Sequence, residues 1–238
     1  MTAASSTRAT VVVAALLGVV LTGCGADSEP PPAPTTNPAG RVLTVQEAEA
    51  ALPTQESFPV PVKEVRPSEP STDDLVTDPS QCKDVLFTGS AVKSFHRKND
   101  VARVERTYAL EESGSQVTVR VQSSKIEPPA DFFDLAGEAL VACQNYRVID
   151  EKDPSTWAAQ PLGVNVSAER VFAVRLRVTE APESPAMTEL TADLIQTQQG
   201  HNTVRVLSVS KVDDDRDDLA AQVANQTLAR LGGQDSSP

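Results

Sequence analysis

This sequence has few aromatic residues and no cluster of positive charge. Phe, Trp and Tyr make up 4% of its 238 residues, so a buried core has to be built mainly from Val, Leu and Ala. The formal net charge is −12, and the Lys and Arg residues are scattered. Nucleic acid and anionic lipid surfaces attract basic patches. We therefore expect no nucleic-acid partner and no adhesion to anionic membrane surfaces.

Familiar catalytic motifs are also absent. The sequence holds no Gly-x-Ser-x-Gly, no His-Glu-x-x-His and no phosphate-binding glycine loop. His96 and His201 show no ligand spacing with each other or with the cysteines. A carboxylate pair for hydrolysis stays open, although nothing selects two acids from the 33 present. The sequence thus predicts no enzyme, no cofactor and no metal site.

The acidic run at 213–218 raises a calcium alternative. Asp213, Asp215 and Asp217 have the alternate spacing that begins an EF-hand loop, but the loop glycine is missing and Ala224 stands where the bidentate Glu belongs. Acids at a helix N-terminus complement the helix dipole. We therefore interpret the run as the start of the last helix.

Residues 1–23 have the pattern of an export signal. Arg8 precedes an apolar run from Val11 to Leu21, which is long enough for a signal peptide and too short to span a bilayer. Leu21-Thr22-Gly23-Cys24 resembles the lipobox of bacterial lipoproteins, which implies a thioether-linked diacylglycerol on Cys24 and acylation, as by palmitate, of the freed amine. The alternative is an ordinary cleaved signal followed by a chance cysteine. We expect a lipid anchor on the outer face of the cytoplasmic membrane.

Three cysteines then leave an even pair. With Cys24 acylated, Cys82 and Cys143 remain in an oxidising compartment, where a disulfide is expected. Closing a loop of that length stabilises a fold by about 4 kcal/mol in the chain-entropy model. Metal binding by the two thiols is the rival interpretation.

The organisation of the mature chain follows from its composition. Residues 24–41 are rich in Pro and Ala and predict a flexible tether, 42–232 predict one folded domain, and 233–238 predict a disordered tail. Thr44 and Glu47 fit a capping box that opens a helix ending before Pro53. The stretch 53–78 predicts an irregular excursion, and Asp78-Pro79 predicts the start of a short helix.

Period-two patterns from about residue 91 predict strands. Strands are expected at 101–112 and 115–124 around a Ser113-Gly114 turn, and at 170–180, 188–197 and 202–212. Helices are expected at 132–143 and from the acidic run to Leu231. His96 then falls at a strand end, His201 falls in a turn, and the break in alternation at Val206-Leu207 predicts a bulge. The fold class is α+β: a largely antiparallel twisted sheet of about five to six strands, with helices packed on one face and one disulfide.

Arginines on the polar face of these strands form a candidate ligand site. Arg175 and Arg177, with Arg103 and Arg120, alternate with the apolar positions, so they would place guanidinium groups on an open sheet face for a carboxylate or phosphate. The alternative is a solvated face with cross-strand ion pairs to Glu105, Glu189 or Asp193. Trp157, the only tryptophan, is interpreted as a core anchor or a cleft wall.

The pattern as a whole resembles the PknH-type extracellular sensor domain family. The resemblance rests on LTVQEAEAALP, a Cys in a short Asp-Pro-led helix, FFDLAGEALVAC, and a closing hairpin and helix, and it covers about 42–232. That family occurs as the outer portion of actinobacterial receptor kinases and as free-standing envelope lipoproteins. The resemblance implies an antiparallel sheet with helices around a ligand cleft. Members often carry two disulfides, whereas this chain offers one pair. LpqN-type lipoproteins, with a PsbP/Mog1-like sheet, are a second resemblance.

Together these observations predict a function. We expect a membrane-anchored extracytoplasmic lipoprotein with a non-catalytic ligand-binding or sensor-like domain, whose partner is an envelope small molecule or protein. The alternative is an envelope scaffold or chaperone-like lipoprotein that acts through protein contacts.

Overall fold

The computed structural model of the chain describes residues 38–66, 75–149, 154–211 and 218–232. The predicted signal peptide, the lipobox cysteine and the tail lie outside the described residues, as do 213–217 of the acidic run. Among the described helices, none is long and apolar enough to cross a membrane.

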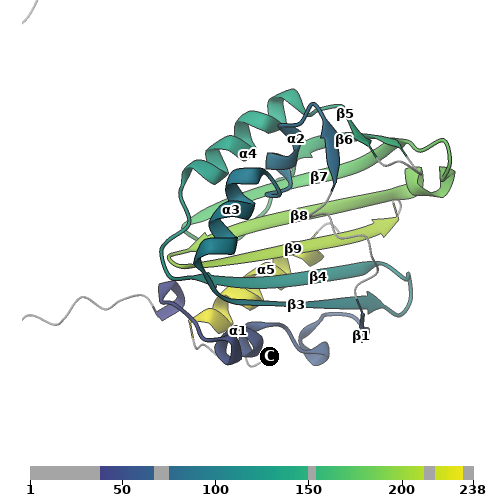
Figure 1. The fold of residues 1–238 in the computed structure, drawn as a ribbon. Coiled ribbons are helices and arrows are strands. Elements are labelled where there is room, and N and C mark those ends of the chain that lie inside the picture. The colour runs from purple at the N-terminus through teal and green to yellow at the C-terminus, as the bar shows by residue number, and fades with distance from the viewer. Residues whose placement is uncertain (1–37, 67–74, 150–153, 212–217, 233–238) are drawn as a thin grey trace, which may run out of the picture. The chain divides into compact units, whose positions relative to one another are not determined.

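Within the described residues, nine strands form one antiparallel sheet (Figure 1). The strands are β1 (Val62–Val65), β2 (Val76–Asp78), β3 (Asp100–Leu110), β4 (Gln116–Ser124), β5 (Tyr146–Ile149), β6 (Ser155–Pro161), β7 (Arg170–Glu180), β8 (Leu190–Gln199) and β9 (Asn202–Lys211). Their order across the sheet is β1-β3-β4-β9-β8-β7-β6-β5-β2. The long strands β3, β4, β7, β8 and β9 are those that the period-two patterns predicted.

The predicted count of five to six strands is therefore wrong. The additional strands lie toward the two edges of the sheet: β1 and β2 come from the stretch expected to be irregular, and β5 and β6 follow the middle helix. Three of them, β1, β2 and β5, have only three or four residues, whereas β6 has seven. A strand of three or four residues shows too few alternations to reveal a period of two. These strands are fixed by pairing with longer neighbours, as β1 is by its register with β3 from Val62↔Leu110 to Val65↔Thr107.

Five α-helices accompany the sheet in the described residues. They are α1 (Val45–Ala51), α2 (Cys82–Val85), α3 (Ser90–Asn99), α4 (Asp131–Ala142) and α5 (Leu219–Leu231), with 3₁₀ turns η1 (Pro38–Gly40), η2 (Gln55–Ser57) and η4 (Pro185–Glu189). The capping box is confirmed: the Thr44 side chain accepts from the Glu47 amide, and the Glu47 carboxylate accepts from the Thr44 amide at 2.8 Å. Residues 90–99, which were predicted to begin a strand, form the helix α3 instead.

The prediction of helices on one face is also wrong, because helices cover both faces of the sheet. Figure 1 shows α2, α3 and α4 in front of the strands and α5 behind them. Two separate apolar cores result. One joins α1 and α5 to β3, β4 and parts of β8 and β9, and the other joins α2, α3 and α4 to β5, β6, β7 and the opposite side of β8 and β9.

Strand β9 shows how consecutive residues serve the two cores. Val206 belongs to the core of α1 and α5, whereas Leu207 packs against the core of α2–α4. Successive strand residues point to opposite faces. The register with β4 and β8 runs without interruption through both residues. The predicted bulge is therefore absent at this point, and the break in polar alternation reflects a strand that is buried on two sides.

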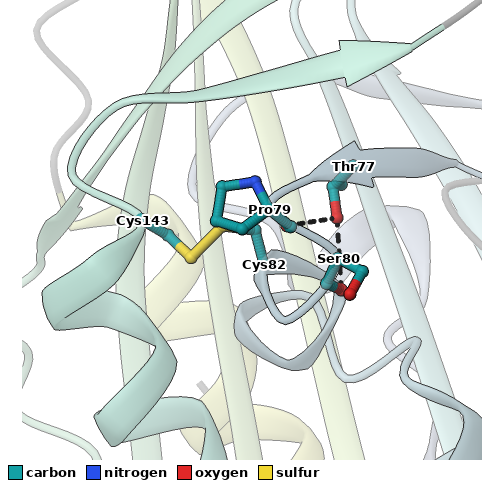
Figure 2. The surroundings of a disulfide bond; sticks show 5 residues. All are labelled: Thr77, Pro79, Ser80, Cys82 and Cys143. Carbon is teal, nitrogen blue, oxygen red and sulfur yellow. Dashed lines mark hydrogen bonds between the residues drawn. A yellow bond between two sulfur atoms is a disulfide. The ribbon is translucent and has the colours of Figure 1, made fainter.

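The predicted disulfide is present and joins α2 to the residue that ends α4 (Figure 2). Cys82 and Cys143 have Cα atoms 5.7 Å apart, are 61 residues apart in sequence, and are both fully buried. The segment before Cys82 is held by the Thr77 hydroxyl, which donates to the carbonyls of Pro79 at 3.0 Å and Ser80 at 3.3 Å. The helix itself begins at Cys82 rather than at Pro79, which follows a cis peptide bond.

Candidate ligand-binding cavity

A cavity of about 590 Å³ lies between the sheet, α3 and the first turn of α4. Pockets of 300–1,000 Å³ are typical of sites for small organic molecules. Its lining residues are Phe87, Val92, Lys93, His96, Arg97, Asp100, Arg103, Arg120, Gln122, Pro128, Phe132, Phe133, Gln196, Thr203 and Arg205. The side chains from β3, β4, β8 and β9 form its floor, and the two helices form its walls.

The charge of this cavity is opposite to that of the protein. Five of the lining side chains are basic, namely Lys93, Arg97, Arg103, Arg120 and Arg205, and of the described lining residues Asp100 alone is a carboxylate. The whole chain carries −12. Arg205 is 7% exposed, which places a guanidinium where water screens it weakly. The cavity thus concentrates positive charge in a site of reduced solvent access.

The basic floor follows from strand register. Arg120 on β4 lies directly opposite Arg205 on β9, which in turn lies opposite Gln196 on β8. The row continues on either side to Glu105 on β3 and Phe172 on β7. Residues paired across an antiparallel sheet point to the same face. The row therefore changes from charged to polar to aromatic across five adjacent strands.

Arg120 also forms an ion pair within this row. Its Nε donates to Glu105 Oε2 at 2.5 Å, and the side chains of the two residues are 13% and 28% exposed. The pair fixes the position of Arg120 while leaving it in the cavity lining.

Asp100 organises the wall where α3 meets β3. Its Oδ1 lies 2.8 Å from His96 Nδ1 and accepts from the Ser124 hydroxyl at 3.1 Å, and its Oδ2 accepts from Gln122 Nε2 at 3.0 Å. Burial alone would raise the pKa of Asp100, but the hydrogen bonds from His96, Gln122 and Ser124 and the nearby imidazole outweigh it and lower that pKa. Both carboxylate oxygens therefore interact with side chains of the wall, and one of them orients His96.

Aromatic rings form the opposite wall. Phe87, Phe132 and Phe133 line the cavity. Each contacts another phenylalanine: Phe87 meets Phe133 at 5.1 Å and Phe172 at 5.4 Å between ring centroids, and Phe132 meets Phe95 at 5.6 Å. Phe87 has a φ of 51°, the one positive value among the described residues other than glycine. A bulky residue in the left-handed region costs about 1–3 kcal/mol and persists where the surroundings impose it. Here the strained backbone holds the ring at the cavity.

The four arginines of the sequence-based site fall on two different faces. Arg103 and Arg120 line the cavity. Arg175 and Arg177 alternate with Val174 and Leu176, which pack under α2–α4, so they point to the other face of the sheet. Arg175 forms a two-pronged ion pair with Asp193, with bonds of 2.7 and 2.8 Å, and Arg177 is exposed. Ligand binding by Arg175 and Arg177 stays a prediction. Arg120 and Arg175 form cross-strand ion pairs with Glu105 and Asp193, as the alternative interpretation expected.

The two histidines and the single tryptophan lie in different surroundings. His201 is in the β8–β9 turn as expected, with Nδ1 3.0 Å from the Ser124 carbonyl oxygen. His96 lies on α3, not at a strand end, and lines the cavity. Trp157 packs partly buried against the core of α2–α4, with its Nε1 donating to Ser155. In the described part of the chain, no group of three or more His, Cys, Asp and Glu is placed to hold a metal ion.

Sequence reasoning missed the contribution of α3 to the site. The signal was present: Val92 and Phe95, three residues apart, are the buried positions of this helix, and Lys93, His96, Arg97 and Asp100 follow at helical spacing. The helix is short and passes directly into β3, so the period of two of the strand masks the helical spacing before it.

Comparison with known proteins places the fold. No protein-family model matches the sequence, and no curated protein matches it. Among solved structures, the extracellular domain of PknH from Mycobacterium tuberculosis aligns with a TM-score of 0.56 at 12% identity, over 82% of this chain and 99% of that chain. The Rv0999 ortholog of Mycobacterium smegmatis aligns with a TM-score of 0.39 at 11% identity, also over 82% and 99%. The domain therefore has the fold of a PknH-type extracellular domain.

Proposed function

We propose that this protein is an extracytoplasmic lipoprotein whose domain binds a small anionic ligand in the cavity, without catalysis, as a sensor-like or ligand-carrying module. The observation that carries the proposal is the reversal of charge: five basic side chains and one internally hydrogen-bonded carboxylate line a cavity in an acidic protein. Guanidinium groups bind carboxylates and phosphates with charge-assisted hydrogen bonds.

The extracytoplasmic location and the lipid anchor are part of this proposal. A buried disulfide suits an oxidising compartment, and the likeness in fold to an extracellular domain agrees with it. The lipobox pattern at Cys24 supports attachment to the outer face of the cytoplasmic membrane. A transmembrane sensor and a free lipoprotein would expose the same domain to the envelope.

The two other functions considered gain less support. The exposed large apolar residues of the described chain are Val42, Val45, Val76, Val101, Ile126, Leu135, Val141, Ile149 and Val171, of which Val76 and Ile149 lie opposite each other on β2 and β5. A protein-docking scaffold would be expected to gather such residues into one patch. Hydrolysis by two carboxylates would need a second acid beside Asp100, and of the described lining residues no other is acidic.

A binding titration tests the proposal. The full chain, reconstituted into phosphatidylcholine nanodiscs, is titrated calorimetrically with inorganic phosphate, with empty nanodiscs as the blank. Each charge-assisted hydrogen bond contributes about 1.5–3 kcal/mol. We therefore expect Arg205→Gln to weaken phosphate binding at least about tenfold, and Arg103→Gln, on the exposed part of β3, to weaken it in the same direction.

Matched variants separate this site from general charge effects. Arg147→Gln removes an exposed arginine on β5 that does not line the cavity, and it should leave phosphate binding unchanged. Arg177→Gln tests the sequence-based site on the opposite face. The absence of saturable phosphate binding, or an equal loss in Arg147→Gln and Arg205→Gln, overturns the proposal.

A further inference from the structure

We infer that the ligand of this cavity is an anionic amphiphile, with a phosphate-like group held by the guanidiniums of β3, β4 and β9 and a hydrocarbon part held against Phe87, Phe132 and Phe133. This inference rests on the proposed function and specifies its ligand class. It draws on the polarity of the two walls and on the place where the chain enters the domain.

The cavity is divided into a charged side and an aromatic side. Along the row that crosses the floor, Arg120 and Arg205 lie on β4 and β9, and Phe172 lies on β7. Neighbouring strands are about 4.8 Å apart, so Arg205 and Phe172, two strands apart, have backbones separated by about 10 Å. The Phe172 ring contacts Phe87, which lines the cavity. An anionic head group and an apolar tail therefore meet different surfaces within one cavity.

The aromatic side is more than a filled core. The chain has six phenylalanines, and three of them, Phe87, Phe132 and Phe133, line this cavity. Phe133 is half-buried. A purely ionic ligand such as phosphate or citrate would gain nothing from apolar walls, whereas each methylene buried there would contribute to binding.

The chain enters the domain at the end of the sheet where the cavity lies, against the core of α1 and α5 on the opposite face. Asn202 Nδ2 donates to the carbonyl oxygens of Ala39 at 2.7 Å and Arg41 at 2.8 Å, and the His201 amide donates to the Gly40 carbonyl at 3.0 Å. The next residue, Thr203, lines the cavity. The first described residues are thus tied to the end of the sheet at which the cavity lies.

The length of chain between the proposed anchor and the domain limits how far apart the two can lie. Fifteen residues separate Cys24 from Ala39, and a chain of that length spans at most about 50 Å. An amphiphile in the outer leaflet is therefore within reach of a cavity at this end of the sheet. The acidic exterior disfavours adhesion to an anionic membrane surface. The cavity gathers five basic side chains in one partly enclosed place, which suits capture of single molecules.

The test compares octyl phosphate with two ligands that each carry one of its parts, the phosphate or the octyl chain. The full chain in phosphatidylcholine nanodiscs is titrated with octyl phosphate, inorganic phosphate and octyl glucoside, with empty nanodiscs as blanks. Two buried methylenes correspond to about tenfold in affinity. We expect octyl phosphate to bind more than about tenfold tighter than inorganic phosphate, and octyl glucoside to bind weakly.

Variants assign the two parts of the ligand to the two walls. Phe133→Ala, and Phe133→Leu as the milder change, should weaken octyl phosphate and leave inorganic phosphate unaffected. Arg205→Gln should weaken both. Arg147→Gln should change neither. If the two phosphates bind equally and depend on Arg205, the amphiphile inference fails while the proposed function stands. If neither phosphate binds, both fail.

A last comparison distinguishes the sources of the same head group. Nanodiscs that contain phosphatidic acid present the phosphate monoester in the bilayer. Competition with octyl phosphate in these discs indicates a ligand taken from the membrane, and tight octyl phosphate binding without competition indicates a free amphiphile. Displacement of octyl phosphate by octyl glucoside alone would show that the apolar wall acts without the guanidiniums and would overturn the inference.

Discussion

Substituting Gly200 by alanine tests how the first described residues are held to the sheet. Gly200 has a φ of 54° in the β8–β9 turn, and a Cβ there would lie 2.6 Å from the Gly40 carbonyl oxygen and 2.8 Å from the Gly40 Cα. Gly114, in the β3–β4 turn, has a φ of 71° but no heavy atom within 4 Å of such a Cβ. The two glycines therefore share the backbone constraint and differ in the close approach.

The expected magnitudes follow from that difference. A side chain in the left-handed region costs about 1–2 kcal/mol, which applies to Gly114→Ala and Gly200→Ala alike. At Gly200 the clash is with backbone, so residues 39–41 have to move and their hydrogen bonds to His201 and Asn202 are weakened. Each such bond contributes about 0.5–1.5 kcal/mol. We therefore expect about 2–5 kcal/mol for Gly200→Ala and about 1–2 kcal/mol for Gly114→Ala.

Urea denaturation of both variants measures the difference, and hydrogen exchange locates it. The amide of His201 should exchange faster in Gly200→Ala and at the wild-type rate in Gly114→Ala. Equal free energies of unfolding for the two variants, with unchanged exchange at His201, would show that the contact between residues 39–41 and the turn does not contribute to stability.

Four further outcomes are expected. Replacing Cys82 and Cys143 together by alanine should lower the free energy of unfolding by about 4 kcal/mol, because a loop of 61 residues is released; a loss below about 1 kcal/mol in denaturant titrations would contradict this. Cys24→Ala should abolish partitioning of the protein into the detergent phase, and membrane retention with normal processing would disprove the lipobox interpretation. Arg175→Gln should lower the free energy of unfolding by about 1–3 kcal/mol, because Asp193 is left buried without its partner, and should leave phosphate titrations unchanged. Asp100, whose pKa is lowered in the fold, contributes stability above pH about 4 that is lost as the pH falls through the folded value, so the stability difference between wild type and Asp100→Asn should shrink in acid; a difference constant from pH 7 to pH 3 would refute this.

Local signals in the sequence predicted local structure well. The Thr44–Glu47 capping box, the hairpin around Ser113-Gly114 and the pairing of Cys82 with Cys143 all depend on residues whose chemistry specifies the partner. The short strands β1, β2 and β5 depend on pairing with strands far away in the chain. Each has only three or four residues, which is too few to show an alternating pattern in the sequence.

Two of the four arginines of the predicted site, Arg103 and Arg120, line the cavity, and the other two do not. Alternation shows which side chains lie opposite the valines of a strand, but it does not show which face of the sheet those valines occupy. The valines of β4 pack under α1 and α5, and Val174 of β7 packs under α2–α4. Arg120 and Arg175 both alternate with valines and yet point to opposite faces. Only the positions of the helices could have separated them.

The same distribution of helices explains why a cavity forms where it does. Helices α1 and α5 pack on one face over β3, β4, β8 and β9, whereas α4 packs on the other over β6 and β7, with α2 against α4 and β2. Each face is thus apolar on one half and polar on the other. On the face of α1 and α5, the polar half near β7 is occupied by the Arg175–Asp193 ion pair, where each charge satisfies the other.

On the opposite face, the polar half over β3, β4 and β9 has a different composition. Its row holds Arg120 and Arg205 with one acid, Glu105, so positive charge is in excess along the row. Helix α3 lies beside this half and adds Lys93 and Arg97 to the lining, while Phe87 and the start of α4 close the apolar side. A paired acid and base make a structural contact, whereas a partly enclosed surface with more bases than acids attracts anions. The proposed binding of an anionic ligand rests on this distribution of charge.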